Sequence, residues 1–479
     1  MYTLRFAIEP YSCDVRNATD SNNISSAANE VVGCLGSHIC KYGGRTQRLL
    51  GNSLLWGDVI TQLPSGVLAW KYGGKIVLCT CMFISALVTL LTPLSFETNT
   101  DLAITSRFIL GLSQGATWPA VQTILARWSP PQETGRLAGL AYSGSQIGVI
   151  GSMFITLFCK HWCEGSWPGL FYIQGNLSLL MVIICIVLIT DTPAVNTRIS
   201  VEEKDFITGS QRNRGLCLVQ NGDTVPWRGM LTSFPLWAIL ASHTCGAFGS
   251  YVYLSCTSSY IQRVITDETN KNILQVTPYL GLIVVILLTG HIADHIRSTD
   301  NLSTTSIRKI FNSIGELIPA LVLIVAGFLP SYQSTIKLTL LIMGASLTGC
   351  VYSGGYVVNV IDISPQHAGI VFGISSTIAS AFVLLGSAAI GESIDVEYQG
   401  NWEILFVVTA AIYMFGGLIY LVFGSGSLQH WNTTPCTTDH DETHGPDDIV
   451  SSAATPTTGA QGGETCASLP IDFIEDVHT

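Results

Sequence analysis

Charged residues are scarce in this chain. Asp, Glu, Lys and Arg make up 11% of its 479 residues, whereas soluble domains average about 25%. The mean hydropathy is +0.43. This balance excludes an ordinary soluble globular protein and favours a chain that lies mostly in lipid.

The sequence also lacks the signatures of common enzyme sites. It contains no His-Glu-x-x-His motif, no Walker A phosphate loop and no zinc-type spacing of Cys and His. One nucleophile-elbow pattern, Gly111-Leu112-Ser113-Gln114-Gly115, lies in an apolar stretch, whereas a working elbow needs a strand–turn–helix context with His and acid partners. We therefore expect no enzyme activity, no cofactor and no metal.

Basic residues are absent from the end of the chain. Residues 425–479 hold nine acidic residues and neither Lys nor Arg, and they account for most of the net charge of −11. Their Thr, Ser, Pro and Gly content predicts an acidic, disordered tail. Because the rest of the chain is nearly neutral, we expect no nucleic-acid partner.

Apolar stretches of membrane-spanning length are abundant instead. A bilayer core about 30 Å thick requires about 20 apolar residues as a helix, and backbone groups in lipid must be hydrogen-bonded within the segment. Eleven spans are predicted, at 49–70, 75–96, 101–127, 137–159, 169–190, 234–256, 276–296, 311–330, 336–361, 369–391 and 403–424.

Two patterns recur at an offset of roughly half the chain. The motif Ser129-Pro130-Pro131-Gln132, with Gly135 and Gly139 after it, returns as Ser364-Pro365-Gln366 with Gly369 and Gly373, and Gly66 to Lys71 returns more loosely as Gly290 to Asp294 with Arg297. Parallel repeats of this kind predict two six-helix halves. The first helix of the first half is then largely missing.

We therefore predict an all-α polytopic membrane protein divided into two six-helix halves. We expect it to be monomeric and to lie in the plasma membrane or in a lysosomal or vesicular membrane. A slight excess of Lys and Arg in one set of loops orients it, and the glycosylation sequons at Asn17 and Asn23 face the opposite side. The expected parts are a remnant of the first helix (1–12), a lumenal or extracellular loop (13–48), an N-terminal bundle (49–190), a cytoplasmic linker (191–230), a C-terminal bundle (231–424) and a cytoplasmic tail (425–479).

Few ionisable residues interrupt the spans, and such residues usually face a cavity. Arg107 and Gln114 are two helical turns apart on one face. An arginine there is suited to bind a carboxylate or phosphate through its planar fork, or it reaches the interface along its aliphatic stem. Arg5 is a similar candidate in the incomplete first helix.

Four further residues are candidates for coupling and gating. Asp58 lies a few residues inside the first predicted span, where it either carries a proton from a cavity or pairs with an arginine of a neighbouring helix. Asp294, Arg297 and Asp362 fall at helix ends, where gate or capping roles are expected.

Small residues recur at four-residue spacing in two spans. Gly135, Gly139, Gly144, Gly148 and Gly151 form one series, and Gly369 and Gly373 begin another. Such series allow helix backbones to approach closely, which predicts close helix contacts where the halves meet.

Several motifs together resemble the anion:cation symporter branch of the major facilitator superfamily, which contains sialin, vesicular glutamate and nucleotide transporters, and type I sodium–phosphate cotransporters. The resemblance runs in order from about residue 1 to 431. It rests on Leu4-Arg5, Trp56-Gly57, Ile60-Thr61-Gln62-Leu63-Pro64, Tyr72-Gly73-Gly74-Lys75, Gln114-Gly115 with Pro119, Trp128 to Glu133, Arg136-Leu137, Phe171-Tyr172, Asp191-Thr192-Pro193, Pro226-Trp227, Ile292-Ala293-Asp294 with Arg297, Ser303 to Lys309, Asn359 with Asp362 and Pro365, Gly424, and Leu428-Gln429 with Trp431.

The resemblance implies the major facilitator fold and a central site for a small anionic solute. Alternating access would arise from rocking of the two halves. Arg107 and Arg5 match arginines that the family associates with anion binding. Gln114, Gln122 and Asn359 would add hydrogen bonds to the substrate.

Departures from the family pattern bear on the coupling ion. Gln114 stands where proton-coupled members carry a glutamate, Gln122 and Val360 replace histidines, Gly246 replaces an arginine of glutamate carriers, and Asp58 replaces a tyrosine. These departures favour transport of a phosphate-, urate- or sialate-like anion driven by sodium or voltage, or by protons if Asp58 has taken over the coupling role. The alternative function is a truncated, transport-inactive membrane protein with an interaction or regulatory role.

Overall fold

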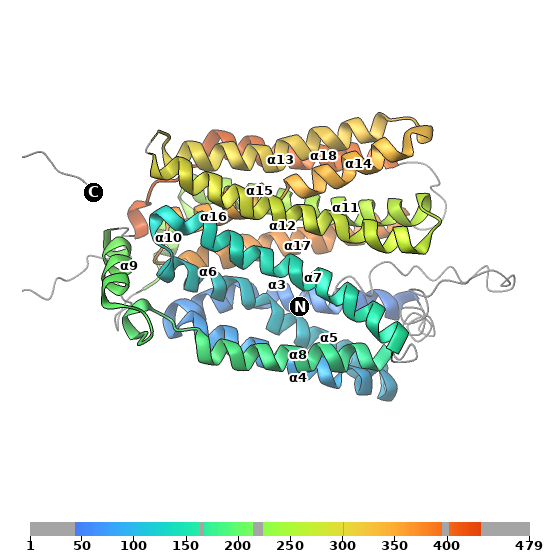
Figure 1. Cartoon of the computed structure of the whole chain (residues 1–479), viewed down its shortest axis with the longest axis horizontal. Helices are drawn as coiled ribbons and strands as arrows, with labels where there is room; N and C mark the ends of the chain where they lie inside the picture. Colours follow the sequence, from blue (N-terminus) through green and yellow to red (C-terminus); the bar gives the residue numbers. More distant parts are fainter. Residues whose placement is uncertain (1–43, 163–166, 214–223, 300, 395–401, 433–479) are drawn as a thin grey trace, which may run out of the picture. The chain divides into compact units, whose positions relative to one another are not determined.

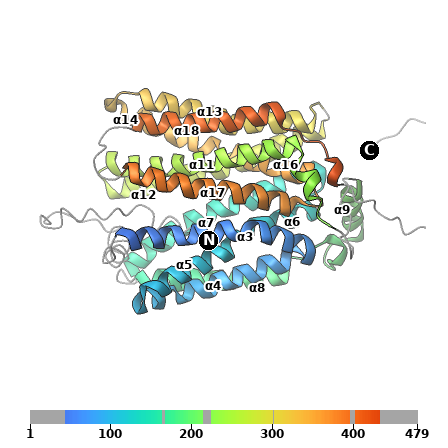
Figure 2. The same cartoon turned by 180° about the vertical axis from the view of Figure 1, so that it is seen from behind.

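The computed structural model describes residues 44–162, 167–213, 224–299, 301–394 and 402–432. Helices and their connections make up this part of the chain, and no strand occurs in it. Figures 1 and 2 show the long helices lying side by side, with the short helix α9 (Val201–Asn213) at one end of them. That end is called the linker end below.

The helices of each half follow the predicted order. The first half contains α3 (Gly44–Tyr72), α4 (Gly74–Thr98), α5 (Thr100–Gly115), α6 (Thr117–Trp128), α7 (Thr134–Trp162) and α8 (Trp167–Leu188). The second half contains α11 (Phe234–Val264), α12 (Glu268–Ser298), α13 (Thr304–Phe328), α14 (Ser334–Leu347), α15 (Cys350–Ser353), α16 (Tyr356–Ile363), α17 (Ala368–Ile394) and α18 (Trp402–Phe423). The short α10 (Trp227–Leu231) precedes α11.

Each of the eleven predicted spans coincides with a helix or a broken helix. Eight helical stretches of the described residues are long and apolar enough to cross a membrane. The fold is therefore that of an all-α, multi-pass membrane protein, as predicted. Not every predicted span is among these eight. Helix α3 carries the buried Asp58, and the span 101–127 is divided into α5 and α6, each of which is too short to cross a membrane alone.

Two predicted spans are interrupted within the membrane. The span 101–127 breaks at Ala116, because Pro119 has no N–H to donate to the carbonyl of Gly115 and its ring crowds that carbonyl. The span 336–361 breaks twice, between α14 and α16. Both breaks precede the repeated Ser-Pro motif, so the repeat predicted from sequence is also a repeat in helix shape.

The two halves meet along two pairs of helices. In one pair α3 packs on α17, and in the other α12 packs on α7. Helices α4, α5 and α8 lie on one outer side of these pairs, while α13, α14 and α18 lie on the other (Figures 1 and 2). The largest buried apolar cluster draws on both halves, including Ala138, Tyr142, Ile286, Val357 and Val360.

Glycines permit the closest approaches in both pairs. A Cβ atom on Gly66 of α3 would collide with the carbonyl oxygen of Gly369 on α17. A Cβ atom on Gly290 of α12 would lie 2.6 Å from the carbonyl oxygen of Gly135 on α7. The backbones therefore touch at the positions that the sequence repeat equates.

The predicted glycine series on α7 is only half correct. Gly135 approaches α12 and α15, and Gly139 approaches α12. A Cβ atom on Gly144, Gly148 or Gly151 would meet no atom within 4 Å. The close contact is confined to the first turns of α7. Gly144 and Gly148 are exposed whereas the neighbouring Val149 is buried, so the later glycines lie on another face of the helix.

Candidate functional site

At the linker end, a carboxylate of α12 is hydrogen-bonded to the start of α7. Asp294 is 1% exposed. Its side chain accepts hydrogen bonds from the backbone N–H groups of Gly135, at 3.0 Å, and Arg136, at 2.7 Å. These N–H groups belong to the first turn of α7 and have no acceptor within their own helix. Asp294 thus caps a helix of the other half, in agreement with its expected place at a helix end.

The α3–α17 contact has aromatic residues at the equivalent place. Trp70, which the repeat equates with Asp294, stacks on His367 with ring centroids 5.8 Å apart and 24° between planes. His367 also faces Trp431, with the ring centroids 6.4 Å apart. The α7–α12 contact is therefore stabilised by a charged side chain, and the α3–α17 contact by stacked rings.

An ion-pair network lies within the second half at the same end. Asp362 of α16 accepts a hydrogen bond of 2.7 Å from Arg308 Nε and one of 3.1 Å from Arg297 Nη1. The Asp362 and Arg308 side chains are 1% and 2% exposed, whereas that of Arg297 is 20% exposed. The predicted helix-end residues Arg297 and Asp362 are thus brought together, and Arg308, which the sequence reading missed, is their most buried partner.

The first half carries a looser counterpart. Asp191 accepts a 2.8 Å hydrogen bond from the backbone N–H of Lys75 at the start of α4, and it faces Arg127 at 4.0 Å. Gly73 has φ +101°, a conformation that L residues rarely adopt. A Cβ atom there would also lie 2.7 Å from both carboxylate oxygens of Asp191. The Tyr-Gly-Gly-Lys motif therefore allows Asp191 to cap α4.

An aromatic layer, formed by Trp118, Tyr142 and Tyr352, crosses between the halves. Trp118 and Tyr142 stack with centroids 4.1 Å apart, and Tyr142 lies 5.3 Å from Tyr352. Gln122 is fully buried beside this layer. Its amide donates to the hydroxyl of Tyr142 at 2.8 Å and to the carbonyl of Val357 at 3.4 Å, while its Oε1 atom has no hydrogen-bond partner among the residues that the structure describes.

The predicted anion-binding pair lies beyond this layer. Arg107 and Gln114 are both on α5, before the break at Ala116, whereas Trp118 and Gln122 follow the break. Arg107 is 2% exposed and Gln114 is half-buried. Since α6 ends at the linker end, the aromatic layer separates this pair from that end.

Asp58 occupies the contact between the halves. It is 7% exposed, and its Oδ2 atom accepts hydrogen bonds from Gln62 Nε2 at 2.8 Å and from Ser380 Oγ at 3.1 Å. Gln62 also donates to Ser380, at 3.0 Å. This cluster joins α3 to α17 within the membrane-spanning region.

Asn359 has a different environment from the one expected of a substrate ligand. It is fully buried in α16, and its amide donates to the backbone carbonyl of Ser425 at 2.9 Å. That contact holds the segment after α18 against α16 near the linker end. Arg5 and the sequons at Asn17 and Asn23 lie outside the described residues.

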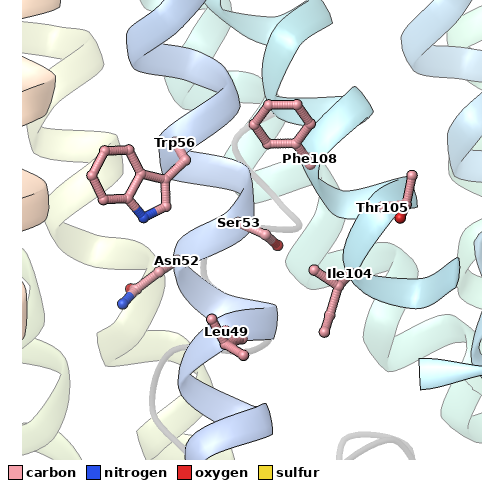
Figure 3. A pocket seen from close by; sticks show the side chains of 7 residues that line it. All are labelled: Leu49, Asn52, Ser53, Trp56, Ile104, Thr105 and Phe108. Carbon is pink, nitrogen blue, oxygen red and sulfur yellow. The ribbon is translucent and has the colours of Figure 1, made fainter. Parts of the chain in front are cut away.

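A groove of about 340 Å³ opens between α3 and α5 (Figure 3). Leu49, Trp56, Ile104 and Phe108 give it a largely apolar surface, and the polar members of its lining are Asn52, Ser53 and Thr105. Neither Arg107 nor Asp58 lines it, so this groove is separate from the candidate anion site.

The sequence reading missed Glu316, a fully buried carboxyl on α13. The signal was present, because a lone acidic residue inside an apolar span is costly unless it has a function or a partner. Trp70 and His367 had no comparable signal, since their pairing depends on how α3 crosses α17.

Comparisons with known proteins agree with this architecture. The Major Facilitator Superfamily model matches residues 41–387. Two solved structures share the fold: a proton:xylose symporter, with a TM-score of 0.63, 12% identity and coverage of 84% of this chain and 94% of the other, and the fucose:proton symporter of E. coli, with a TM-score of 0.57, 14% identity and coverage of 83% and 95%.

Curated relatives match over most of the chain. Sialin of Homo sapiens is 32% identical, with 82% of this chain and 78% of sialin covered. Sodium-dependent phosphate transport protein 3 of Mus musculus is 31% identical, with 82% and 81% covered. Vesicular glutamate transporter 3 of Danio rerio is 29% identical, with 82% and 66% covered. This chain therefore belongs to the major facilitator superfamily, in the anion:cation symporter branch that contains sialin, and is a multi-pass membrane transporter rather than an enzyme.

Proposed function

We propose that this transporter moves a small organic or inorganic anion by alternating access and that Arg107 is its principal anion-binding group. The observation that carries this proposal is a buried guanidinium on a membrane helix, two turns from the half-buried Gln114. A charged group at that depth is retained for an ion pair or a ligand. The names of the phosphate and glutamate transporters among its relatives support an anion as that ligand.

Gln114 and Gln122 extend the proposed site along the same broken helix. Gln114 offers both an N–H donor and a carbonyl acceptor, which suits the hydroxyls of a sugar acid or the oxygens of phosphate. Gln122 retains an unused buried carbonyl oxygen. A buried acceptor without a partner is costly, so a donor on the substrate or a bound water would be favoured there.

Alternating access requires the linker end to open. The contacts that separate are the Asp294 cap on α7, the Trp70–His367 stack and the aromatic layer. We place this end in the cytoplasm, following the distribution of Lys and Arg. The proposal predicts that an antibody epitope inserted between α8 and α11 is reached only after the membrane is permeabilised.

Asp58 is the proposed coupling group of the first half. Its carboxylate bridges α3 and α17 through Gln62 and Ser380, so a change in its charge alters a contact that rocking must rearrange. Coupling to a proton, to sodium or to the membrane potential is the part of the function that experiment must assign.

The direct test is uptake by the purified full chain in liposomes. Radiolabelled phosphate, urate, sialic acid and glutamate are offered under an imposed potential, with and without sodium or a pH gradient. We expect one anion to accumulate and Arg107→Ala to abolish its uptake. Arg198→Ala, which removes an exposed arginine, is the matched control. Uptake that survives Arg107→Ala, or no uptake of any anion by folded protein, contradicts the proposal.

A further inference from the structure

Glu316 lies in the middle of α13 and is fully buried. It faces α11 and α18 from within the second half. A Cβ atom on Gly246 of α11 would lie 3.0 Å from its Oε1 atom, and one on Gly417 of α18 would lie 3.2 Å from Oε2. Helix backbones without side chains therefore make room for this carboxyl.

Two neutral groups bind the carboxyl. Ser242 of α11 donates to Oε1 at 2.6 Å, and Asn312, one turn earlier on α13, donates to Oε2 at 3.3 Å. Among the residues that the structure describes, no Lys, Arg or His forms an ion pair with Glu316. The nearest buried arginine on its own helix, Arg308, is already bound to Asp362.

The titratable neighbours are also neutral in their ordinary forms. Cys245 on α11, Tyr356 on α16, and Tyr413 and Tyr420 on α18 are close enough to interact electrostatically with the carboxyl. None of them supplies a positive charge. A carboxylate held without a compensating cation at this depth is unfavourable, whereas the protonated acid is tolerated.

A continuous set of contacts runs from Glu316 to the interface between the halves. Asn312 accepts a hydrogen bond from the backbone N–H of Tyr356, the first residue of α16 after the helix break, at 3.2 Å. The Tyr356 ring lies 5.1 Å from that of His243, and His243 is hydrogen-bonded to Ser375 of α17 at 2.9 Å. Because α17 packs on α3, a change at Glu316 can reach the surface along which the halves rock.

We propose that Glu316, with Ser242 and Asn312, is a proton-binding site that couples transport to a pH gradient. The carboxylate takes one proton from water on one side of the membrane to form the neutral acid, and it returns that proton to water on the other side after the halves have rocked. No other bond is made or broken. This inference rests on the proposed transport function and names its coupling ion.

The groups around the carboxyl favour a proton over sodium. A hard cation such as sodium is bound by several oxygen ligands with free lone pairs. Here Ser242 and Asn312 direct an O–H and an N–H at the carboxyl, and the Asn312 oxygen already accepts from Tyr356. The expectation of sodium or voltage coupling arose from the lack of a carboxylate at position 114, and Glu316 supplies one on the opposite half.

The test uses full-length protein in liposomes, with the panel of radiolabelled phosphate, urate, sialic acid and glutamate as probes. Acid-driven net uptake and counterflow at equal pH are measured for each probe. Wild type is expected to show both activities with at least one probe. Glu316→Gln is expected to keep counterflow within about twofold and to lose at least tenfold of the acid-driven uptake. Glu97→Gln, an exposed carboxyl at the end of α4, should match wild type.

Each other result is decisive. Acid-driven uptake that survives Glu316→Gln overturns the proton site, as does stimulation by sodium that requires Glu316. Loss of counterflow together with uptake in folded Glu316→Gln shows a role other than proton coupling and also overturns it. Failure of the proposed function is distinct, because wild type itself then lacks counterflow with every anion of the panel.

A second variant guards against misfolding of Glu316→Gln. Ser242→Ala removes the 2.6 Å hydrogen bond and keeps the carboxyl. We expect it to retain counterflow and to shift the pH midpoint of uptake toward higher pH, since the ionised form loses a donor. An unchanged midpoint overturns the assignment, whatever the state of the glutamine variant.

Discussion

Asp294 on α12 and Gly135 on α7 are joined across the two halves by a hydrogen bond of 3.0 Å between a carboxylate oxygen and a backbone N–H. The two residues are far apart in sequence, and each belongs to a repeated motif. In the other half-to-half contact the equivalent of Asp294 is Trp70. The two equivalent contacts between the halves therefore differ in chemistry, a capped carboxylate in one and stacked rings in the other.

Removing the Asp294 carboxylate should loosen the start of α7. Each hydrogen bond to a charged group contributes about 1.5–3 kcal/mol, so Asp294→Ala should accelerate amide exchange over residues 134–142 at least about tenfold. Hydrogen–deuterium exchange with mass spectrometry measures this directly. Asp101→Ala, at the exposed start of α5, should leave these peptides unchanged. Equal exchange in both variants would show that the cap does not hold this end closed.

Gly135 and Gly144 form a matched pair for testing the close approach on α7. A Cβ atom at position 135 would lie 2.7 Å from Asp294 Oδ1 and 3.0 Å from the carbonyl of Ser353, whereas position 144 is open. We expect Gly135→Ala to destabilise the protein by about 1–3 kcal/mol and Gly144→Ala to be neutral or stabilising by up to about 1 kcal/mol. The Tm of the two variants in detergent measures the difference, and equal Tm values would contradict it.

The Arg308–Asp362 pair should dominate stability at the linker end. Breaking a buried ion pair on one side leaves an uncompensated charge and costs about 3–5 kcal/mol, so Asp362→Asn should lower the Tm by several degrees. Arg297→Met, which removes the more exposed partner, should cost no more than about 1 kcal/mol. A Tm that falls equally in both variants would argue against a special role for the buried arginine.

The shape of the Arg107 side chain should matter as well as its charge. Lysine keeps the charge but loses the planar fork that binds carboxylate or phosphate through two hydrogen bonds. Arg107→Lys should therefore raise the KM for the transported anion about tenfold, which corresponds to loss of one charge-assisted hydrogen bond. Concentration dependence of counterflow reports this. An unchanged KM would show that the anion does not bind to Arg107.

Asp58 offers a separate test of coupling in the first half. If Asp58, which replaces a tyrosine, carries the coupling proton instead of Glu316, Asp58→Asn should abolish the pH dependence of uptake while the amide keeps the contacts to Gln62 and Ser380. Uptake of the carried anion across a series of external pH values is the measurement. Unchanged pH dependence would exclude Asp58 and leave the carboxyl on α13 as the candidate.

The sequence was sufficient for the fold because the membrane imposes simple rules. Each apolar stretch had to be a helix, and the repeated Ser-Pro and Gly motifs located the two halves. Pro119 explains the helix break at Ala116. The break was not predicted, because it lies within a continuous apolar stretch. The later glycines of α7 make no close contact, because the five-residue step from Gly139 to Gly144 turns them onto another face of the helix, and the predicted series overlooked this step.

The site was predictable only in part. Arg107 and Gln114 share a helix face that periodicity reveals, and Asp294 was expected at a helix end. The partners of Asp294 on α7 were not predictable, because they are backbone N–H groups, which every residue except proline carries. Asn359 matched a family motif but contacts Ser425. Its role as a substrate ligand stays a prediction.

The contrast between Trp70 and Asp294 has a mechanical consequence. Stacked rings gain most from exclusion of water and respond little to ionic strength, whereas a carboxylate on amide groups responds to protonation. A change of pH at the linker end should therefore weaken the α7–α12 contact before the α3–α17 contact. The α7–α12 contact should then separate first during opening, and the Trp70–His367 stack of the α3–α17 contact should separate after it.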